Sequence, residues 1–485
     1  MRLRLLFLSA QKTQKTERGL TKHIIYGINN TLWNRVGQAL WEGEFSVQDR
    51  QEQYLSDLSE MIRCETVSSG QGVDRGVFYE FHALLRRLFP RLFSISSLEE
   101  FSGSLLLVWH GSDPEAEPIL LMNHHDVVEA SGAWRHPPFS AAVEGGKLYG
   151  RGTLDTKSGL YAMLRAAEEL ALSGFVPTRD VYFVSTCTEE TTGEGADLIS
   201  AELARRGVRF AFALDEGGMI LSEPIGGAKG AFAVVGVGEK GDADLRFVAR
   251  SSGGHASTPS KNTPLVRLGK FMAAAERKKL FRAKLSPTVC AMLRELSRTM
   301  RGPLRFVFGH PRLFSPLLVR VMPAVSGAAG AMLKSTLAFT MASGSGAPNV
   351  LPSEAWVIGN LRYSHHQGRD GSIEALRRLA RRYDVECEIL QSGFPSPISD
   401  HRSDAFRLIG RAVSATFEGV RTVPYVMTAA SDARYMSRVS DVCLRFTPFR
   451  VSDEQLESIH GIDENIDVSA LVPAVDFYKY VIREA

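Results

Sequence analysis

The chain has 485 residues, 44% of them hydrophobic and 23% charged, a composition typical of globular proteins and unlike that of disordered or fibrous ones. The formal net charge of +3 is small for this length and gives no argument for nucleic acid or an anionic membrane as the main partner. Five cysteines, an odd number without C-x-x-C spacing, disfavour a disulfide scaffold and a cysteine–zinc site. A reducing compartment fits this usage.

The N-terminal segment Met1–Gly19 contains an apolar run that is too short and too charged for a membrane-spanning helix. It is also a poor signal peptide, because Arg4 interrupts the short apolar core. We therefore predict a cytoplasmic protein. Residues 1–45 are predicted to form an N-terminal arm, with a helical pattern around 24–40.

The next part of the chain alternates between helical and strand-like patterns. Apolar residues at helical spacing predict helices over 46–63, 76–88 and from 160 to about 173. Short apolar runs predict buried strands at 105–110, 119–122, 181–186 and 210–214. Strands alternating with helices favour an α/β fold with a doubly wound, mostly parallel sheet, here the catalytic domain.

The pattern changes near residue 239. Strands are predicted at 244–250, 335–341, 354–363 and 385–390, with helices over 263–278 and 371–383. This strand-helix-strand-strand-helix-strand order is typical of a ferredoxin-like α+β domain. We therefore divide the chain into the first part of the catalytic domain (46–238), an inserted lid or dimerisation domain (239–393) and the second part of the catalytic domain (394–485).

The lid is predicted to carry an extra helical insert over about 279–333, rich in Leu, Phe, Pro and Arg. Pro316, Arg320 and Pro323 interrupt its apolar run, so a membrane span is not expected. The insert faces a hydrophobic acyl chain of the substrate, or it packs against its own domain or a partner subunit; the pattern leaves these alternatives open.

Polar residues with metal-binding side chains stand where the predicted strands end. They are His124 with Asp126, Asp155 in a Gly-flanked turn, the pair Glu189-Glu190, and Asp215, with His460 later in the chain. In open α/β sheets, ligands bind beyond the carboxyl ends of the strands. Two histidines with several carboxylates and no cysteine suit zinc, cobalt or manganese. Two such ions with one bridging carboxylate would lie about 3.5–4 Å apart.

Each of these residues taken singly also fits a structural role. Asp155 fits a helix N-cap, Asp215 a turn residue, and Glu189-Glu190 an acidic pair at a helix start. Their joint placement at strand ends favours a metal site.

Seven segments in order resemble the co-catalytic metallopeptidase family of aminoacylase-1, carboxypeptidase S, glutamate carboxypeptidase and succinyl-diaminopimelate desuccinylase. The segments are LLMNHHDVV, GRGTLDTKSG, CTEETTGEGA, ALDEGG, SSGGHASTP, APNVLPSEAWVIGNLRY and IHGIDENI, and the match covers roughly residues 46–485. The long insert most resembles the branch with carboxypeptidase S and N-fatty-acyl-amino-acid hydrolase. Two positions depart from the pattern: His125 competes with His124, and Ala429-Ala430-Ser431-Asp432 replaces Gly-Gly-Thr-Asp.

The resemblance implies a site for two divalent metal ions, Zn²⁺ in the first place and Co²⁺ or Mn²⁺ as alternatives. His124, Asp155 and Asp215 would hold one ion, with Asp155 bridging, and Glu190 and His460 would complete the other.

The resemblance also implies roles in catalysis and substrate binding. Glu189 would be the general base and Asp126 would support His124, while His255 would contribute to oxyanion binding, often across a dimer. Asn349 and Arg362 would contact the substrate, because a planar guanidinium suits its carboxylate.

The predicted activity is hydrolysis of an amide bond next to a free carboxylate, by a metal-bridged hydroxide with Glu189 as general base. The substrate would be a small peptide cleaved at its C-terminal bond, or an N-acyl amino acid, and a homodimer is expected from the resemblance. Two alternatives remain: an amidohydrolase of carbamoyl-amide or deacetylase type, and a catalytically silent binding homologue.

Overall fold

The computed structural model describes residues 46–68 and 75–485. The predicted N-terminal arm of residues 1–45 lies outside these residues. The first described helix, α3 (Val47–Arg63), begins after Ser46, whose side chain accepts a hydrogen bond from the backbone N–H of Asp49. The Asp49 side chain accepts one from the Ser46 backbone in return, which completes a capping box and fixes the helix start.

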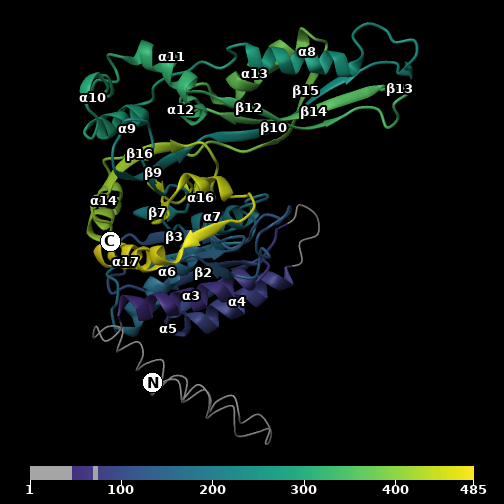
Figure 1. Cartoon of the computed structure of the whole chain (residues 1–485). Coiled ribbons are helices and arrows are strands. Elements are labelled where there is room, and N and C mark those ends of the chain that lie inside the picture. The colour runs from purple at the N-terminus through teal and green to yellow at the C-terminus, as the bar shows by residue number, and fades with distance from the viewer. Residues whose placement is uncertain (1–45, 69–74) are drawn as a thin grey trace, which may run out of the picture.

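A large ten-stranded sheet forms the lower body of the molecule (Figure 1). Its order is β1 (Ser96–Phe101), β2 (Ser104–Trp109), β6 (Val181–Thr186), β3 (Ile119–His124), β7 (Phe212–Asp215), β17 (Cys443–Arg445), β9 (Ala231–Glu239), β8 (Ile220–Ser222) and β18 (Arg450–Val451), and β16 (Arg421–Met427) pairs with β9.

This sheet is mixed, which corrects the prediction of a mostly parallel one. The central strand β3 is parallel to both of its neighbours, β6 and β7. Toward one edge of the sheet, β2 is antiparallel to β6, and β1 is antiparallel to β2. The antiparallel pairing of β9 with β8 and β17 interrupts the other side. The strands that meet the predicted site are the parallel ones.

Helices cover both faces of this sheet, as the doubly wound prediction required. One face packs against α3, α5 (Pro90–Ile95), α6 (Lys157–Leu172), α14 (Asp404–Thr416) and α17 (Leu471–Glu484), and the other against α7 (Glu194–Arg205) and α15 (Ala433–Met436). Along β3, Leu121 joins the first core and Leu120 and Met122 join the second. The continuous apolar run of this strand follows from burial on both sides. The short helix α4 (Gly76–Leu88) packs beside α3.

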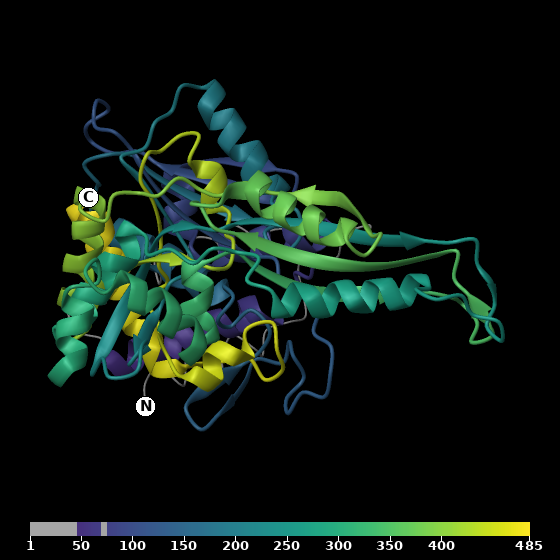
Figure 2. The same cartoon turned by 90° about the horizontal axis from the view of Figure 1, so that it is seen from above.

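A small four-stranded antiparallel sheet lies above the large one (Figure 1). Its order is β12 (Thr336–Ser343), β14 (Glu354–Tyr363), β10 (Gly241–Arg250) and β15 (Glu386–Ser392). Helices α8 (Pro264–Arg277) and α13 (Gly368–Arg381) cover one face, and the chain order of these elements is the predicted one. Seen from above, the sheet extends sideways to a tip where β11 (Gly254–His255) pairs with β13 (Val350–Leu351) (Figure 2).

The predicted insert is helical, with α9 (Pro287–Ser297), α10 (Gly302–Gly309), α11 (Ser315–Val325) and α12 (Gly327–Leu333). Its inner side chains form a core with Phe232 and Val234 of β9 and Val423 of β16. These helices therefore pack onto the large sheet, beside the small one (Figure 1). A third sheet, β19 (Asn465–Asp467), β5 (Lys147–Tyr149) and β4 (Ala142–Glu144), lies near the carboxyl ends of the central strands. The remaining short elements are β18, α16 (Asp453–Ser458) and a 3₁₀ turn at Val468–Ala470.

Candidate metal centre

The carboxyl ends of three parallel strands meet at one edge of the large sheet. His124 is the last residue of β3, Asp215 is the last of β7, and Glu189-Glu190 follow β6. Asp155 comes from the loop before α6, and His460 from the turn after α16. The sequence-predicted residues thus arrive from five separate segments of the chain.

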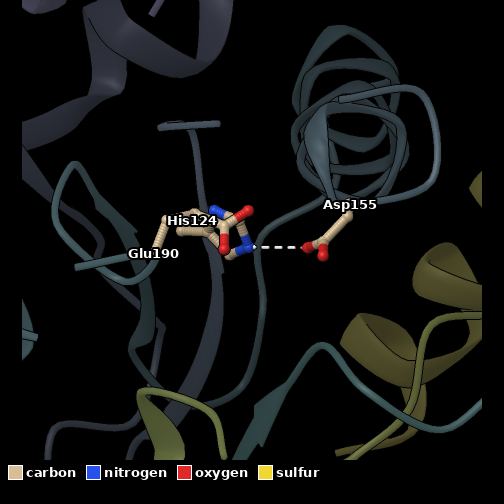
Figure 3. A group of neighbouring side chains, drawn as sticks. All are labelled: His124, Asp155 and Glu190. Atoms are coloured by element: carbon tan, nitrogen blue, oxygen red, sulfur yellow. Dashed lines mark hydrogen bonds and ion pairs between the residues drawn. The ribbon is translucent and has the colours of Figure 1, made fainter. Parts of the chain in front are cut away.

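Four of the predicted ligands form one cluster. The Nε2 atom of His124 lies 2.9 Å from Oδ1 of Asp155, and Nε2 of His460 lies 3.0 Å from Oδ2 of the same carboxylate. His460 Nε2 also lies 3.0 Å from Oε2 of Glu190. One ligand atom each from His124, Asp155 and Glu190 lies within 4.8 Å of the others, and Figure 3 shows the three side chains converging. The adjacent His125 points elsewhere, with its Nδ1 2.8 Å from Ser185 Oγ.

The donor set fits a pair of divalent ions. Asp155 presents one oxygen to each imidazole, as a bridging carboxylate must, and the set contains the two histidines and carboxylates that zinc, cobalt or manganese accept. Oε1 of Glu190 is buried and, among the residues that the structure describes, has no hydrogen-bond partner. A buried carboxylate oxygen without a partner is costly, and a cation would satisfy it.

The charges in the cluster depend on one another. Burial opposes ionisation of Asp155, but hydrogen bonds from His124 and His460 outweigh it and lower the pKa of this carboxyl. Hydrogen bonds to Asp155 and Glu190 raise the pKa of His460 to about 10. Burial raises the pKa of Glu190, and the nearby Asp155 adds to this effect. The carboxylates of Asp155 and Glu190 and the two imidazoles thus stabilise one another's charges, and a bound cation would take the place of the imidazole protons.

Asp126 connects His124 to the glutamate pair. It is fully buried, and its carboxylate accepts hydrogen bonds from the backbone N–H groups of Glu189 (3.2 Å) and Glu190 (3.1 Å) and from the Ser68 hydroxyl (2.6 Å). Its own backbone carbonyl lies 2.9 Å from Nδ1 of His124, which fixes the ring with Nε2 toward Asp155. Asp126 therefore positions three functional residues at once.

Glu189 lies beside the cluster without bonding to it. Burial raises the pKa of its carboxyl well above the usual range; His124 counteracts this effect, and Asp432, Glu216 and Glu190 add to it. Asp432 is itself buried and accepts a 2.6 Å hydrogen bond from Thr186. A carboxylate next to a metal cluster, with a pKa shifted toward neutrality, suits proton transfer.

Asp215 accepts two hydrogen bonds from backbone groups, and its role as a metal ligand stays a prediction. Its Oδ1 accepts the backbone N–H of Glu216 at 2.8 Å, and its Oδ2 accepts the N–H of Ala433 at 2.7 Å. The bond to Ala433 joins the start of α15 to the end of β7. Burial raises the pKa of the neighbouring Glu216 carboxyl well above its usual range, and the charges of Asp155 and Asp215 add to this effect.

Sequence reasoning gave no role to Glu216, which follows Asp215 directly. The tight backbone here depends on glycine, because a Cβ at Gly218 would lie 1.8 Å from the carbonyl oxygen of Val234. Only the direction of each side chain in this turn distinguishes the two acids.

Comparison with known proteins agrees with this geometry. A model of peptidase family M20/M25/M40 matches residues 120–484. The chain belongs to this family. It is 32% identical over 438 residues to the human N-fatty-acyl-amino acid synthase/hydrolase PM20D1, covering 88% of this chain and 87% of the relative. It is 30% identical to the probable carboxypeptidase S-like 2 of Dictyostelium discoideum, covering 88% and 84%.

Solved structures of family members share the fold. The M20 family metallo-carboxypeptidase Sso-CP2 from Sulfolobus solfataricus superposes with a TM-score of 0.66 at 15% identity, covering 88% of this chain and 98% of that one. The di-peptidase Dug1p from Saccharomyces cerevisiae gives 0.65 at 16% identity, covering 90% and 96%. The M20 chain described here is therefore a metallo-hydrolase of mixed α/β architecture with a separate small antiparallel sheet.

Three further predicted residues lie in the chain segment that contains the small sheet, Arg362 in that sheet and His255 and Asn349 at the separate β11–β13 pair. His255 is in β11 at the tip, exposed, with Nδ1 2.7 Å from Ser257 Oγ. Asn349 precedes β13, and its carbonyl accepts the N–H of Ala256 at 2.9 Å. Arg362 lies in β14, and its Nε donates to Asn360 Oδ1 at 3.0 Å. Among the described residues, the hydrogen bonds of the His255 ring are thus local ones, with Ser257.

Proposed function

We propose that this metallo-hydrolase cleaves an amide bond next to a free carboxylate, either the C-terminal bond of a small peptide or the bond of an N-acyl amino acid. The observation that carries the proposal is the cluster of His124, Asp155, Glu190 and His460 with Glu189 beside it. The names of the relatives, an N-fatty-acyl-amino acid hydrolase and a carboxypeptidase S-like protein, support the same substrate class.

The metal ligands in this proposal are His124, Asp155, Glu190 and His460, with Asp155 shared between two ions. The sequence assigned one further carboxylate ligand, Asp215. In this proposal Glu216 takes that role, because the Asp215 oxygens already accept two backbone N–H groups. When bound, the ions would acidify water and polarise the scissile carbonyl.

The chain's own residues supply proton transfer. Glu189 takes a proton from the attacking water and delivers it to the leaving nitrogen, so that one carboxylate acts first as base and then as acid. Asp126 holds the backbone of Glu189 and Glu190 in place and fixes the ring of His124. The positioning of the base thus depends on a residue that touches neither water nor substrate.

Recognition of the substrate carboxylate is assigned to Arg362. Lys240 lies near it, because the charges of Arg362 and Lys334 both contribute to the lowered pKa of Lys240, after burial. Nζ of Lys240 donates to Thr336 Oγ1 at 3.3 Å, and Thr336 pairs with Arg362 across β12 and β14. A positive potential at this point of the small sheet favours an anionic group of the substrate.

His255 would donate a hydrogen bond to the carbonyl oxygen from a second copy of the chain. The support is its exposure in β11, which pairs with β13, the strand labelled far from β3 in Figure 1. The homodimer, Asn349 as a substrate contact and the cytoplasmic location stay predictions.

The test is metal content per chain, measured on the wild type and on Asp155→Ala, together with hydrolysis of an N-acyl amino acid panel and a dipeptide panel. We expect about two ions in the wild type, lost in the variant together with activity. The preferred panel identifies the substrate class. A metal-loaded wild type that is inert on both panels would contradict the proposal.

A further inference from the structure

The helical insert concentrates the positive charge of the chain. We define the basic segment as residues 277–334, from the end of α8 to the residue before the small-sheet strand β12. It contains twelve Lys or Arg residues and a single acid, Glu295, a local excess of eleven positive charges against +3 for the entire chain. The rest of the molecule is therefore acidic, and the charge is strongly asymmetric.

These cations are almost all without an acidic partner. Among the residues described by the structure, only Arg298 of the twelve has a carboxylate within 4 Å, that of Glu295 at 3.2 Å. Elsewhere in the chain, surface arginines such as Arg250 pair with two or three carboxylates. The basic segment thus presents a field that a counter-charged surface could neutralise.

The same segment exposes large apolar side chains. They are Leu304 (48% exposed) and Phe306 (56%) on α10, Leu313 (69%) between the helices, and Leu317 (48%) and Val321 (45%) on α11. Five such side chains fall within eighteen residues of the chain, on two successive helices and the turn between them. We call this set the apolar ridge.

Helix α11 is apolar on two adjacent faces. Leu318 and Met322, four residues apart, are buried in the core shared with β9 and β16. Leu317 and Val321, also four apart, face outward with Arg320 between them. Packing within the chain accounts for the inner pair only, so the outer pair lacks a partner in the described structure.

A cavity of about 1020 Å³ adjoins the ridge through α11. Its cationic lining consists of Lys278, Lys279, Arg282, Arg320 and Lys334. Apolar side chains, including Phe281 and Phe339, line it as well. Charged groups around an apolar interior match an anion with an attached hydrocarbon chain.

We propose that the basic segment docks this protein on an anionic lipid surface, with the apolar ridge entering the headgroup region. Interleaved cations and exposed apolar side chains on short helices are the pattern of an interfacial element. The described helices include none that could cross a bilayer, so the contact would be peripheral.

The distribution of residues favours lipid over two other occupants. Nucleic acid would neutralise the cations but would give no reason to expose five large apolar side chains. A second copy seated on the same patch would bring two strongly basic surfaces together, which like-charge repulsion opposes. This inference is independent of the proposed substrate.

The test is flotation of the full chain with phosphatidylcholine vesicles and with vesicles containing about one-third phosphatidylserine. The charge variant is Arg305→Glu/Arg312→Glu/Arg320→Glu, and the ridge variant is Phe306→Ser/Leu313→Ser/Leu317→Ser. A matched charge control, Lys261→Glu/Arg382→Glu/Arg411→Glu, changes exposed cations elsewhere.

We expect the wild type to bind the anionic vesicles at least about tenfold more tightly than the neutral ones, and high salt to weaken this binding. The charge variant and the ridge variant should each bind the anionic vesicles about tenfold or more weakly than the wild type, with unchanged circular dichroism spectra and unchanged hydrolysis. The control variant should bind like the wild type. Equal binding to both vesicle types, or variants that bind like the wild type, would overturn the proposal. So would a wild type that ignores vesicles and instead binds duplex DNA or self-associates through the ridge.

Discussion

Arg151 and Glu464 form a buried ion pair in which Nη1 lies 2.7 Å from Oε2. The Glu464 carboxylate also accepts the backbone N–H groups of Leu154 (2.7 Å) and Asp155 (3.1 Å), and Arg151 donates to the Gly461 carbonyl at 2.8 Å. The pair therefore joins the loop that carries Asp155 to the turn that carries His460. Two candidate metal ligands, more than 300 residues apart in sequence, are held together by one contact between charged side chains.

The first prediction concerns this pair. Glu464→Gln leaves the Arg151 guanidinium buried without its countercharge, so the free energy of unfolding of the metal-free protein should fall by about 3 kcal/mol. Metal content per chain should also fall, because Asp155 and His460 lose their common support. The exposed pair Arg135–Glu144 provides the matched control: Glu144→Gln should cost less than about 1 kcal/mol and leave metal content unchanged. A Glu464→Gln variant as stable and as metal-loaded as this control would show that the pair does not organise the site.

The second prediction separates the general base from the ligands. Glu189→Gln should lower kcat by about two to four orders of magnitude while metal content stays at the wild-type value, because its carboxylate makes no contact with the cluster ligands in the described structure. Glu190→Gln, one residue further, should lose metal as well as activity. Steady-state kinetics with elemental analysis measures both. Substantial turnover by a metal-loaded Glu189→Gln protein would exclude Glu189 as the base.

The third prediction distinguishes the two acids at the end of β7, Asp215 and Glu216. Glu216→Gln should reduce metal content with little effect on the fold, because its carboxylate is the proposed further ligand beside Asp155. Asp215→Asn should instead lower the free energy of unfolding by about 1–3 kcal/mol, since an amide nitrogen would meet one of two buried N–H donors. Metal analysis and urea denaturation on both variants give the answer. The reverse pattern would restore Asp215 as the ligand.

The fourth prediction is a pH dependence at Lys240. This side chain is 2% exposed, and burial, followed by Arg362 and Lys334, lowers its pKa from 10.5 to about 8. Between these values the unfolded chain binds more protons than the folded one, so this group makes stability rise with pH from about 8 to 10.5. Below pH 8 Lys240 is charged in both states, and the full destabilisation of the folded state by its buried charge is present.

Lys240→Met should therefore raise the free energy of unfolding at pH 7 by about 1–3 kcal/mol, and the difference from the wild type should shrink by pH 10. Urea denaturation at both pH values measures it. The exposed Lys261→Met should change neither value. A constant difference between the two proteins from pH 7 to pH 10 would show that Lys240 does not titrate as described.

Much of the fold could be predicted because local pattern and tertiary burial agree. The runs at 181–186 and 354–363 became β6 and β14 with the predicted bounds, and the pattern at 46–63 became α3. The direction of the outer strands could not be predicted. β2 and β6 are separated by more than seventy residues, and nothing local distinguishes an antiparallel partner from a parallel one.

The net charge hides one feature of the chain. The value of +3 is a sum over 485 residues, in which an acidic majority offsets a basic segment. The spacing of Leu317, Leu318, Val321 and Met322 also predicts only a helix; which pair is buried depends on where β9 and β16 lie.

The sequence by itself determined which residue types stand at strand ends, and hence the family and the chemistry of the site. Strand ends can be read locally, because an apolar run stops where the chain leaves the core. Only the tertiary structure decided that Asp215 accepts the backbone N–H groups of Glu216 and Ala433, and that Glu464 and Arg151 join the segments that carry Asp155 and His460. Those relationships depend on side-chain directions and on contacts between distant segments, and no local pattern encodes them.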